Sequence, residues 1–305
     1  MVSAVIVSMR NSRRLRDALS GLLQHTKTPL EVFVVAYLYP PEELESLRKD
    51  FPDIHIVESN ETRGFSENNN LALRQVSGEY CFIVNDDTLI DSPLVDELVD
   101  DMLKFGPRCA AVTPRIVFPS GKVQTCGRAP WNAWRWMKHY LHLVDETIPT
   151  KWSMKVGQFR TWTLNGACFL ARTSVFRKAG WFDERFFFTP EDIAIGQKFN
   201  EMGYQVWCDS DAVIVHIAGD TASTLGPAIK AARVKGALLY YAPHRFGRFF
   251  LKLYVAVVEF CRLVKHGFRE SVASAVLGSV FTSETPKETF IRINIETEPP
   301  PLLIN

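Results

Sequence analysis

The stretch Phe82-Ile83-Val84-Asn85-Asp86-Asp87-Thr88-Leu89-Ile90 places two adjacent carboxylates directly after a buried apolar run. In open α/β sheets, ligands bind at the carboxyl ends of the strands. Neighbouring acids at such an edge repel each other unless they share a proton or a cation. The stretch therefore indicates one of two things. It forms either a divalent-metal site that holds a phosphate group, or a turn in which Asp87 or Asp91 caps the helix after Ser92-Pro93.

The sequence on both sides of this stretch alternates between apolar runs and amphipathic segments. The pattern predicts strands at 2–7, 31–36, 54–57, 80–84 and 110–113, and helices at 12–24, 40–50, 68–76 and 94–105. Such alternation favours right-handed βαβ crossovers. We therefore predict an α/β fold with a mainly parallel, Rossmann-like central sheet and helices on both faces. The GxGxxG fingerprint is absent, which disfavours a dinucleotide-binding domain.

Composition narrows the class of protein. The chain has 305 residues and a formal net charge of +1, so no strong overall field points to nucleic acid as a partner. Its six cysteines form no CxxC pair, which predicts buried free thiols in a reducing compartment. Met1 leads directly into an apolar strand without a basic leader, and no apolar run is long enough to span a bilayer. We therefore expect a cytoplasmic protein.

The pattern changes after Pro114. Residues 118–122 predict a hairpin turn, and the aromatic-rich segment 131–152 suits carbohydrate stacking or a lid, with a partly buried excursion as the alternative. The remaining predicted strands are 165–171, 205–208 and 212–216, and the remaining predicted helices are 174–179 and 193–202.

The C-terminal part differs from the rest of the chain in its charge and its apolar content. Residues 226–281 are basic and apolar, and they form a predicted helical extension. Six apolar residues share one helical face: Phe249, Phe250, Leu253, Val257, Phe260 and Val264. A basic amphipathic helix indicates peripheral contact of residues 246–269 with an anionic membrane surface, and an oligomer contact or a core-packing helix is the alternative. Residues 282–305 are polar and rich in proline, so we predict a flexible tail.

Several motifs follow one another in a recognisable order. They are Val5-Ile6-Val7-Ser8, Asn85-Asp86-Asp87, Asn165-Gly166-Ala167, Phe182-Asp183-Glu184-Arg185-Phe186-Phe187, Glu191-Asp192 and His216. Together they resemble an inverting GT-A glycosyltransferase of family 2, and they are most similar to its rhamnosyltransferase-like members. The resemblance covers residues 2–245. It implies a GT-A catalytic domain over 1–225, with a nucleotide-sugar-binding half (1–113) and an acceptor-binding half (114–225).

The resemblance also implies roles for the acids. Asp87 would contact a Mg²⁺ or Mn²⁺ ion bound by the sugar-nucleotide diphosphate, and His216 would be a further ligand, with a structural histidine as the alternative. Asp192 would be the general base that deprotonates the acceptor hydroxyl, and Glu191 would orient the acceptor. The alternative for both acids is stabilisation of a helix N-terminus.

Contacts to the nucleotide are implied for a larger set of residues: Ser8, Arg10, Asn11, Tyr37, Arg63, Asn69, Asn85 and Asp86. One departure from the family pattern lies at the end of the second strand. The family usually has an aspartate there that faces the base, whereas this chain has Ala36 followed by Tyr37. Tyr37 is a candidate for stacking on the base instead, and the identity of the nucleotide stays open.

The function implied is metal-dependent transfer of a hexose such as rhamnose. The donor would be a dTDP- or UDP-linked sugar, and the acceptor a hydroxyl of a glycan or lipid-linked glycan. A sugar nucleotidyltransferase is one alternative, but it would need a Gly-rich basic loop where Ser8-Met9-Arg10-Asn11 stands. A non-catalytic carbohydrate-binding protein with a decayed site is the other. Ala36 favours this second alternative, whereas the surviving acids and His216 disfavour it.

Overall fold

The computed structural model describes residues 1–10, 12–143, 155–217, 226–266 and 271–297. Within these residues the strands form one ten-stranded sheet in the order β3-β2-β1-β4-β9-β6-β10-β5, with β7 beside β6 and β8 beside β10. The strands are β1 (Val2–Met9), β2 (Leu30–Tyr37), β3 (His55–Ser59), β4 (Tyr80–Asn85), β5 (Thr88–Leu89), β6 (Cys109–Val117), β7 (Val123–Thr125), β8 (Gln158–Thr161), β9 (Cys168–Arg172) and β10 (Gln205–His216).

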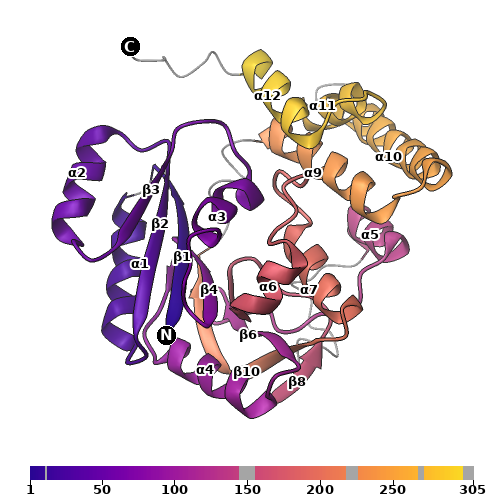
Figure 1. Ribbon diagram of the computed structural model, residues 1–305. Helices are drawn as coiled ribbons and strands as arrows, with labels where there is room; N and C mark the ends of the chain where they lie inside the picture. Colours follow the sequence, from indigo (N-terminus) through magenta and orange to yellow (C-terminus); the bar gives the residue numbers. More distant parts are fainter. Residues whose placement is uncertain (11, 144–154, 218–225, 267–270, 298–305) are drawn as a thin grey trace.

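Helices surround the sheet and extend beyond it (Figure 1). They are α1 (Ser12–His25), α2 (Pro41–Asp50), α3 (Phe65–Leu73), α4 (Leu94–Phe105), α5 (Ala133–Tyr140), α6 (Thr173–Ala179), α7 (Glu191–Glu201), α9 (Gly226–Tyr241), α10 (Arg245–Lys265), α11 (Ser271–Val280) and α12 (Pro286–Thr297).

Most of the long strands run in one direction. β1 pairs in parallel with β2 and β4, β2 pairs in parallel with β3, and β6 pairs in parallel with β10. Strand β9 lies between β4 and β6 and is antiparallel to both. Because β9 is antiparallel to both of its neighbours, β6 runs the same way as β4, and therefore β6 and β10 run the same way as β1. The prediction of a mainly parallel α/β sheet is therefore confirmed.

Strand β1 shows how the sequence builds three layers. Its side chains alternate, so Val2 and Ile6 join the core under α1, α2 and α4, whereas Val5 joins the core under α3, α6 and α7. Both faces of the strand are buried, which is why its sequence is almost continuously apolar. The carboxyl edge of the sheet is left for polar side chains.

Strands β6 and β10 are longer than the segments predicted for them. β6 continues through Pro114 to Val117, and the segments predicted at 205–208 and 212–216 form the single strand β10. The register of β10 shifts between Asp209 and Val213, opposite Pro114. Proline has no N–H to donate to the ladder, so a bulge at this point lets both strands continue past it. The hairpin predicted at 118–122 is confirmed, since the Phe118 amide donates to the Lys122 carbonyl at 2.9 Å.

Helix α3 begins earlier than predicted, at Phe65, because the Glu67 side chain accepts the amide of the N-cap residue Gly64 at 3.2 Å. The prediction for the cysteines holds at five of the six positions. These five cysteines are buried free thiols, whereas Cys261 is free but exposed on α10.

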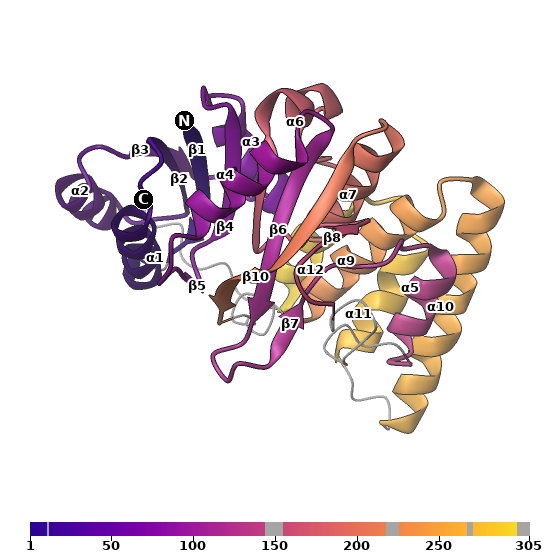
Figure 2. The same cartoon turned by 90° about the horizontal axis from the view of Figure 1, so that it is seen from below.

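The C-terminal helices form a bundle beside the sheet, drawn in orange and yellow in Figure 1. Together with α5 they enclose a third apolar cluster, and Phe187 and Ile193 join that cluster from the sheet domain. Figure 2 shows α5 against α10, where the Tyr254 hydroxyl donates to the Met137 carbonyl at 2.7 Å. Among the described residues, no helix is long and apolar enough to cross a membrane.

The flexible tail predicted for 282–305 is wrong over residues 286–297. These residues form α12, which buries Phe290 and Ile293 in the third cluster. The two apolar side chains lie one helical turn apart and so face the same way. The prolines that suggested flexibility, Pro299-Pro300-Pro301, lie outside the described residues.

Candidate active site

A cavity of about 510 Å³ lies at the carboxyl edge of the sheet. Its walls come from the ends of β1, β2, β4 and β10, from the loops before α3 and β9, and from the start of α7. The described residues that line it are Val7, Met9, Arg14, Tyr37, Arg63, Gly64, Phe65, Asn68, Asn85, Asp86, Asp87, Asn165, Gly166, Ala167, Phe188, Glu191, Asp192 and His216.

The turn after β4 and the end of β10 bring an acid and a histidine together. β10 pairs antiparallel with β5, with His216 opposite Thr88, and the Ile217 amide donates to the Asp87 carbonyl at 2.9 Å. As a result, His216 Nε2 lies 3.0 Å from Asp87 Oδ1. Neither Asp87 nor Asp91 caps α4, because the N-cap residue of that helix is Pro93 and no side-chain bond caps it. The helix-cap interpretation of the opening stretch is therefore wrong.

The contacts of His216 show what this pair can bind. Its Nδ1 lies 2.6 Å from the amide oxygen of Gln124, which only accepts hydrogen bonds, so the Nδ1–H donates to it. In the neutral imidazole, Nε2 then presents a lone pair to the Asp87 carboxylate. Two acceptors at this separation need a proton or a cation between them. Burial opposes ionisation of Asp87, but the hydrogen bond and charge of His216 outweigh it and lower the pKa of Asp87.

This donor set fits a divalent cation only in part. One carboxylate oxygen and one imidazole nitrogen are suitable ligands for Mn²⁺, and the oxygen for Mg²⁺. No group of three or more His, Cys, Asp or Glu side chains that could hold a metal ion occurs in the described ranges of the chain. Asp87 and His216 therefore fit a cation that takes its remaining ligands from a bound diphosphate and water.

Asp86 plays a different part from Asp87. One of its oxygens accepts the Ser8 hydroxyl at 2.5 Å, and the Ser8 oxygen lies 2.6 Å from the Tyr39 hydroxyl. Burial raises the pKa of Asp86 to about 6, against the lowering effect of Ser8, and the charge of Asp87 adds to the increase. Ser8 is fully buried and does not line the cavity. Its position indicates that it holds Asp86 in place.

The other predicted nucleotide contacts divide into two groups. Tyr37, Arg63 and Asn85 line the cavity, and the Tyr37 hydroxyl accepts the Arg63 amide at 3.3 Å. Arg10 and Asn69 do not line it. The exposed Arg10 donates to the Leu38 carbonyl at 2.9 Å, and the buried Asn69 donates to the Phe65 carbonyl at 2.9 Å. Asn11 lies outside the described residues.

Sequence reasoning missed several residues of this cavity. Arg14 is in the first turn of α1, and its position directly after β1 was the signal that it faces the carboxyl edge. Asn68 lines the cavity in place of its neighbour Asn69, and local sequence does not distinguish two successive asparagines. Phe65 and Phe188 also line the cavity, and their apolar side chains carried no chemical signal in the sequence.

Glu191 and Asp192 form the first turn of α7. One oxygen of Asp192 accepts the Ile193 amide at 2.7 Å, and the other lies 3.2 Å from Arg128 Nη1 and 3.3 Å from the Gly166 amide nitrogen. Arg128 also donates to the Leu164 carbonyl at 3.0 Å, so its guanidinium is held in place. The carboxylate of Asp192 is thereby oriented from three sides.

Glu191 has a more apolar environment than its neighbour. It is buried, and its Oε2 has no hydrogen-bond partner within the described part of the chain. Burial, with the negative charge of Asp192 added, raises its pKa well above the usual range. This increase in pKa favours the protonated form of Glu191, which can donate a hydrogen bond.

A second cavity, of about 480 Å³, lies on the other side of Asp192 between α5, α7 and α9. Asp192 and Asn165 line both cavities. The second cavity contains several aromatic side chains, among them Trp131, Trp136 and Tyr140. Burial of these three rings agrees with the alternative of a partly buried excursion, and carbohydrate stacking or a lid stays a prediction. Residues 144–154 of that segment lie outside the described residues.

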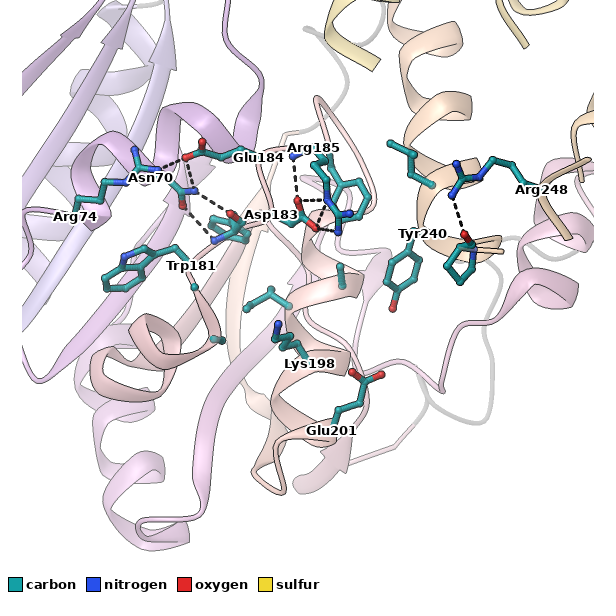
Figure 3. A pocket seen from close by; sticks show the side chains of 18 residues that line it. Asn70, Arg74, Trp181, Asp183, Glu184, Arg185, Lys198, Glu201, Tyr240 and Arg248 are labelled. Carbon is teal, nitrogen blue, oxygen red and sulfur yellow. Dashed lines mark hydrogen bonds and ion pairs between the residues drawn. The ribbon is translucent and has the colours of Figure 1, made fainter. Parts of the chain in front are cut away.

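The motif at 182–187 holds the two sides of the site together. Figure 3 shows Asn70 of α3 reaching this loop, where its side chain donates to the Phe182 carbonyl at 2.9 Å and accepts the Phe182 amide at 3.2 Å. A second contact lies at Gly64, where an added Cβ would come within 2.1 Å of the Phe187 carbonyl oxygen. Only glycine allows this approach, so the nucleotide-side loop and the loop leading to Asp192 are locked together.

These features define a class of protein: an α/β domain with an acid–histidine pair at the sheet edge and a second carboxylate between two cavities. Comparison with known proteins gives the family. The model of Glycosyl transferase family 2 matches residues 3–178, and the chain belongs to this family. The resemblance to family 2 and its rhamnosyltransferase-like members, predicted from the motifs, is thereby confirmed.

Two relatives have curated names. The O-antigen biosynthesis protein RfbC of Myxococcus xanthus is 28% identical over 220 residues, which are 70% of this chain but only 17% of that protein. An N-acetylglucosaminyl-diphospho-decaprenol L-rhamnosyltransferase of Mycobacterium tuberculosis is 23% identical over 250 residues, which cover 72% of this chain and 78% of the relative.

Solved structures agree on the fold. The mannosyltransferase PcManGT of Pyrobaculum calidifontis, in complex with GDP-Man and Mn²⁺, has a TM-score of 0.55 at 16% identity and covers 97% of this chain and 79% of its own. GalNAc-T7 with UDP, GalNAc and Mn²⁺ has a TM-score of 0.60 at 13% identity, and the match covers 98% of this chain and 58% of the GalNAc-T7 chain. The GT-A fold predicted from the sequence is confirmed.

Proposed function

We propose that this chain is a metal-dependent, inverting glycosyltransferase. It moves a hexose from a nucleoside-diphosphate sugar to a hydroxyl of a glycan or lipid-linked glycan. The observation that carries the proposal is the position of Asp192, which lines both the cavity at the sheet edge and the cavity between α5 and α9. A base at such a junction serves a reaction in which two substrates meet from opposite sides.

The cavity at the sheet edge is assigned to the donor. We assign Tyr37 and Arg63 to the base and ribose, and Asn85 and Asp86 to the sugar nucleotide at the turn after β4, because all four line this cavity. Asp87 and His216 would hold Mg²⁺ or Mn²⁺ together with the diphosphate. When bound, the cation would stabilise the negative charge that grows on the leaving diphosphate. Rhamnose from dTDP or UDP is the donor we favour, because one relative is named as a rhamnosyltransferase.

The reaction needs one proton transfer and one displacement. Asp192 accepts the proton of the acceptor hydroxyl, and the hydroxyl oxygen attacks the anomeric carbon from the face opposite the diphosphate. The bond between the anomeric carbon and the diphosphate oxygen breaks, and the nucleoside diphosphate leaves with the electron pair. This single displacement inverts the anomeric configuration. Arg128 keeps Asp192 in place, and Glu191, which lines the donor cavity beside Asp192, can donate a hydrogen bond there in its protonated form.

We also propose that α10 rests on the cytoplasmic face of an anionic membrane. The apolar face of α10 that contains Phe246 and Phe250 is called the apolar stripe, and it is exposed, with 85% of Phe246 and 64% of Phe250 accessible. Leu251 and Val255 face the bundle. The only acid of α10, Glu259, is fully buried and pairs with Arg262. The outer surface of the helix is therefore apolar and basic, which suits an anionic lipid surface.

The transfer reaction can be tested with a panel of sugar nucleotides and Mn²⁺. The wild-type chain should slowly release nucleoside diphosphate from its donor even without acceptor. Asp192→Asn should bind the same donor and lose transfer by about 10²- to 10⁴-fold. The exposed Asp53→Asn serves as the control. Formation of nucleoside triphosphate and sugar 1-phosphate when pyrophosphate is added, without release of nucleoside diphosphate, would point to a nucleotidyltransferase. Normal transfer by Asp192→Asn would remove its assignment as the base.

The membrane contact has a separate test. Vesicles with anionic lipids should sediment the wild-type chain, and Phe246→Ser with Phe250→Ser should reduce this binding without affecting the fold, because both side chains are exposed. Equal binding of the variant and wild type would contradict the proposal. The same substitution pattern at Leu23 and Leu103, exposed residues on α1 and α4, is the control.

A further inference from the structure

The cavity on the acceptor side of Asp192 is lined by cations as well as aromatic rings. Arg128 lies at its inner end, paired with Asp192, and Lys230 and Arg233 of α9 lie along its wall. Lys230 Nζ lies 5.1 Å from the centroid of the Tyr140 ring. Arg233 lines the same cavity as Asp192.

A third cavity, of about 460 Å³, lies beside it between α9 and the end of α10. The two cavities share His142, Lys230 and Arg233, so they adjoin each other, and we call the pair of cavities the channel. The third cavity adds Lys265 and further basic side chains from the last turn of α10. The channel therefore leads from Asp192 to the C-terminal end of the helix that carries the exposed apolar stripe.

The charged side chains that line this channel are mostly basic. Of the described residues that line its two parts, Asp192 is the only one with a carboxylate, and that carboxylate pairs with Arg128. A neutral sugar hydroxyl needs no such field. An anion that enters a low-dielectric channel with several basic side chains is stabilised by charge-assisted hydrogen bonds.

We propose that this channel, through Lys230, Arg233 and Lys265, binds a phosphate or diphosphate group attached to the acceptor sugar. The inference rests on the proposed function, and it specifies the acceptor as a sugar phosphoester. The sugar then lies between the anion and Asp192, with its hydroxyl at the base. The lipid chain of a membrane-bound acceptor would leave the channel at the end of α10, next to the apolar stripe.

The test uses octyl diphosphate, titrated calorimetrically into the full chain in EDTA so that metal-dependent donor binding does not contribute. Lys230→Gln combined with Arg233→Gln should weaken its binding about tenfold or more, because two charge-assisted contacts are lost. Lys49→Gln on α2, an exposed cation far along the chain from the channel, is the matched control and should bind as the wild type does. Thermal unfolding and binding of UDP with Mn²⁺ check that the double variant is folded.

The outcomes separate this inference from the proposed function. Equal affinity of the wild type and the double variant for octyl diphosphate, or no binding by the wild type, would overturn the inference. Octyl glucoside, which has no phosphate, should not compete, and competition by it would also count against the inference. If inorganic pyrophosphate binds as well as octyl diphosphate, the inference stands and a free phosphate suffices, whereas preference for the octyl ester identifies a lipid-linked group. Failure of donor cleavage would refute the transferase proposal and leave this binding result unaffected.

Discussion

His216 Nε2 lies 3.0 Å from Asp87 Oδ1, and Gln124 Oε1 lies 2.6 Å from the other ring nitrogen of His216. Three segments that are distant in the sequence thus form one chain of polar contacts at the carboxyl edge of the sheet. The contact with Gln124 selects the tautomer that presents a lone pair to a cation. Gln124 itself does not line the donor cavity.

Gln124→Ala should therefore weaken the metal site without touching the nucleotide. We expect the affinity for UDP in the presence of Mn²⁺ to fall about 10- to 100-fold, because the imidazole loses the partner that orients it. Affinity measured in EDTA should not change. Gln124→Glu keeps an acceptor oxygen and should restore most of the loss. The same Mn²⁺ dependence in all variants would show that Gln124 has no part in metal binding.

Gly64→Ala should separate the two halves of the site. The added Cβ would lie 2.1 Å from the Phe187 carbonyl oxygen, and this oxygen also accepts the Phe65 amide at 2.9 Å. Relief of the clash requires a backbone shift, and we expect a loss of about 1–3 kcal/mol in the free energy of unfolding with a strong fall in kcat. Gly247→Ala is the control, because nothing lies within 4 Å of its added Cβ. Chemical denaturation and steady-state kinetics provide the measurements, and unchanged values for Gly64→Ala would refute the assigned role.

The raised pKa of Asp101 predicts that the free energy of unfolding depends on pH. Burial, together with the hydrogen bond and charge of Asp209, raises the pKa of Asp101 to about 7, so the folded chain holds a proton that the unfolded chain releases near pH 4. The contribution of Asp101 to the free energy of unfolding is complete below the pKa of the unfolded state. It falls as the pH rises towards 7 and levels off above pH 7, with a slope of at most about 1.4 kcal/mol per pH unit. The pKa of Asp209 is lowered, so it is ionised in both states across this window.

Asp101→Asn should remove that slope. The amide resembles the protonated carboxyl in shape and is neutral, so the variant should be more stable than the wild type above pH 7 and similar to it near pH 4. Urea denaturation at a series of pH values measures this difference. Asp17→Asn, an exposed acid on α1, is the control. A variant that keeps the wild-type slope would show that another group is responsible.

Helix α12 should support the donor cavity from outside. The Phe290 ring lies 4.6 Å from that of Phe187 and 5.8 Å from that of Phe188, which lines the cavity. Phe290→Ala should cost about 3 kcal/mol of stability and raise the KM for the donor. Lys287→Ala, which removes a partly exposed ion pair with Glu67 at 2.8 Å, should cost less than about 1 kcal/mol. Equal effects of the two substitutions would contradict this division of roles.

Local patterns were sufficient for much of the fold. The apolar runs of β1 and β4 and the leucine spacing of α1 depend on residues two to four positions apart, so they can be read from the chain. The same holds for the acids at residues 86–87 and 191–192, because the end of a strand and the start of a helix are local features. Boundaries were less accurate where a side chain acts from outside the apolar pattern, as Glu67 does at the start of α3.

The sequence by itself determined the α/β class, the family and the acids on which the proposed chemistry depends. The tertiary structure decided which side chains meet. It paired Asp87 with His216, placed Arg128 against Asp192, turned Asn68 rather than Asn69 towards the cavity, and folded α12 onto Phe187. The reason is physical: periodicity reports which face of one element is buried, whereas hydrogen bonds and ion pairs between distant segments depend on strand order, register and close backbone approach.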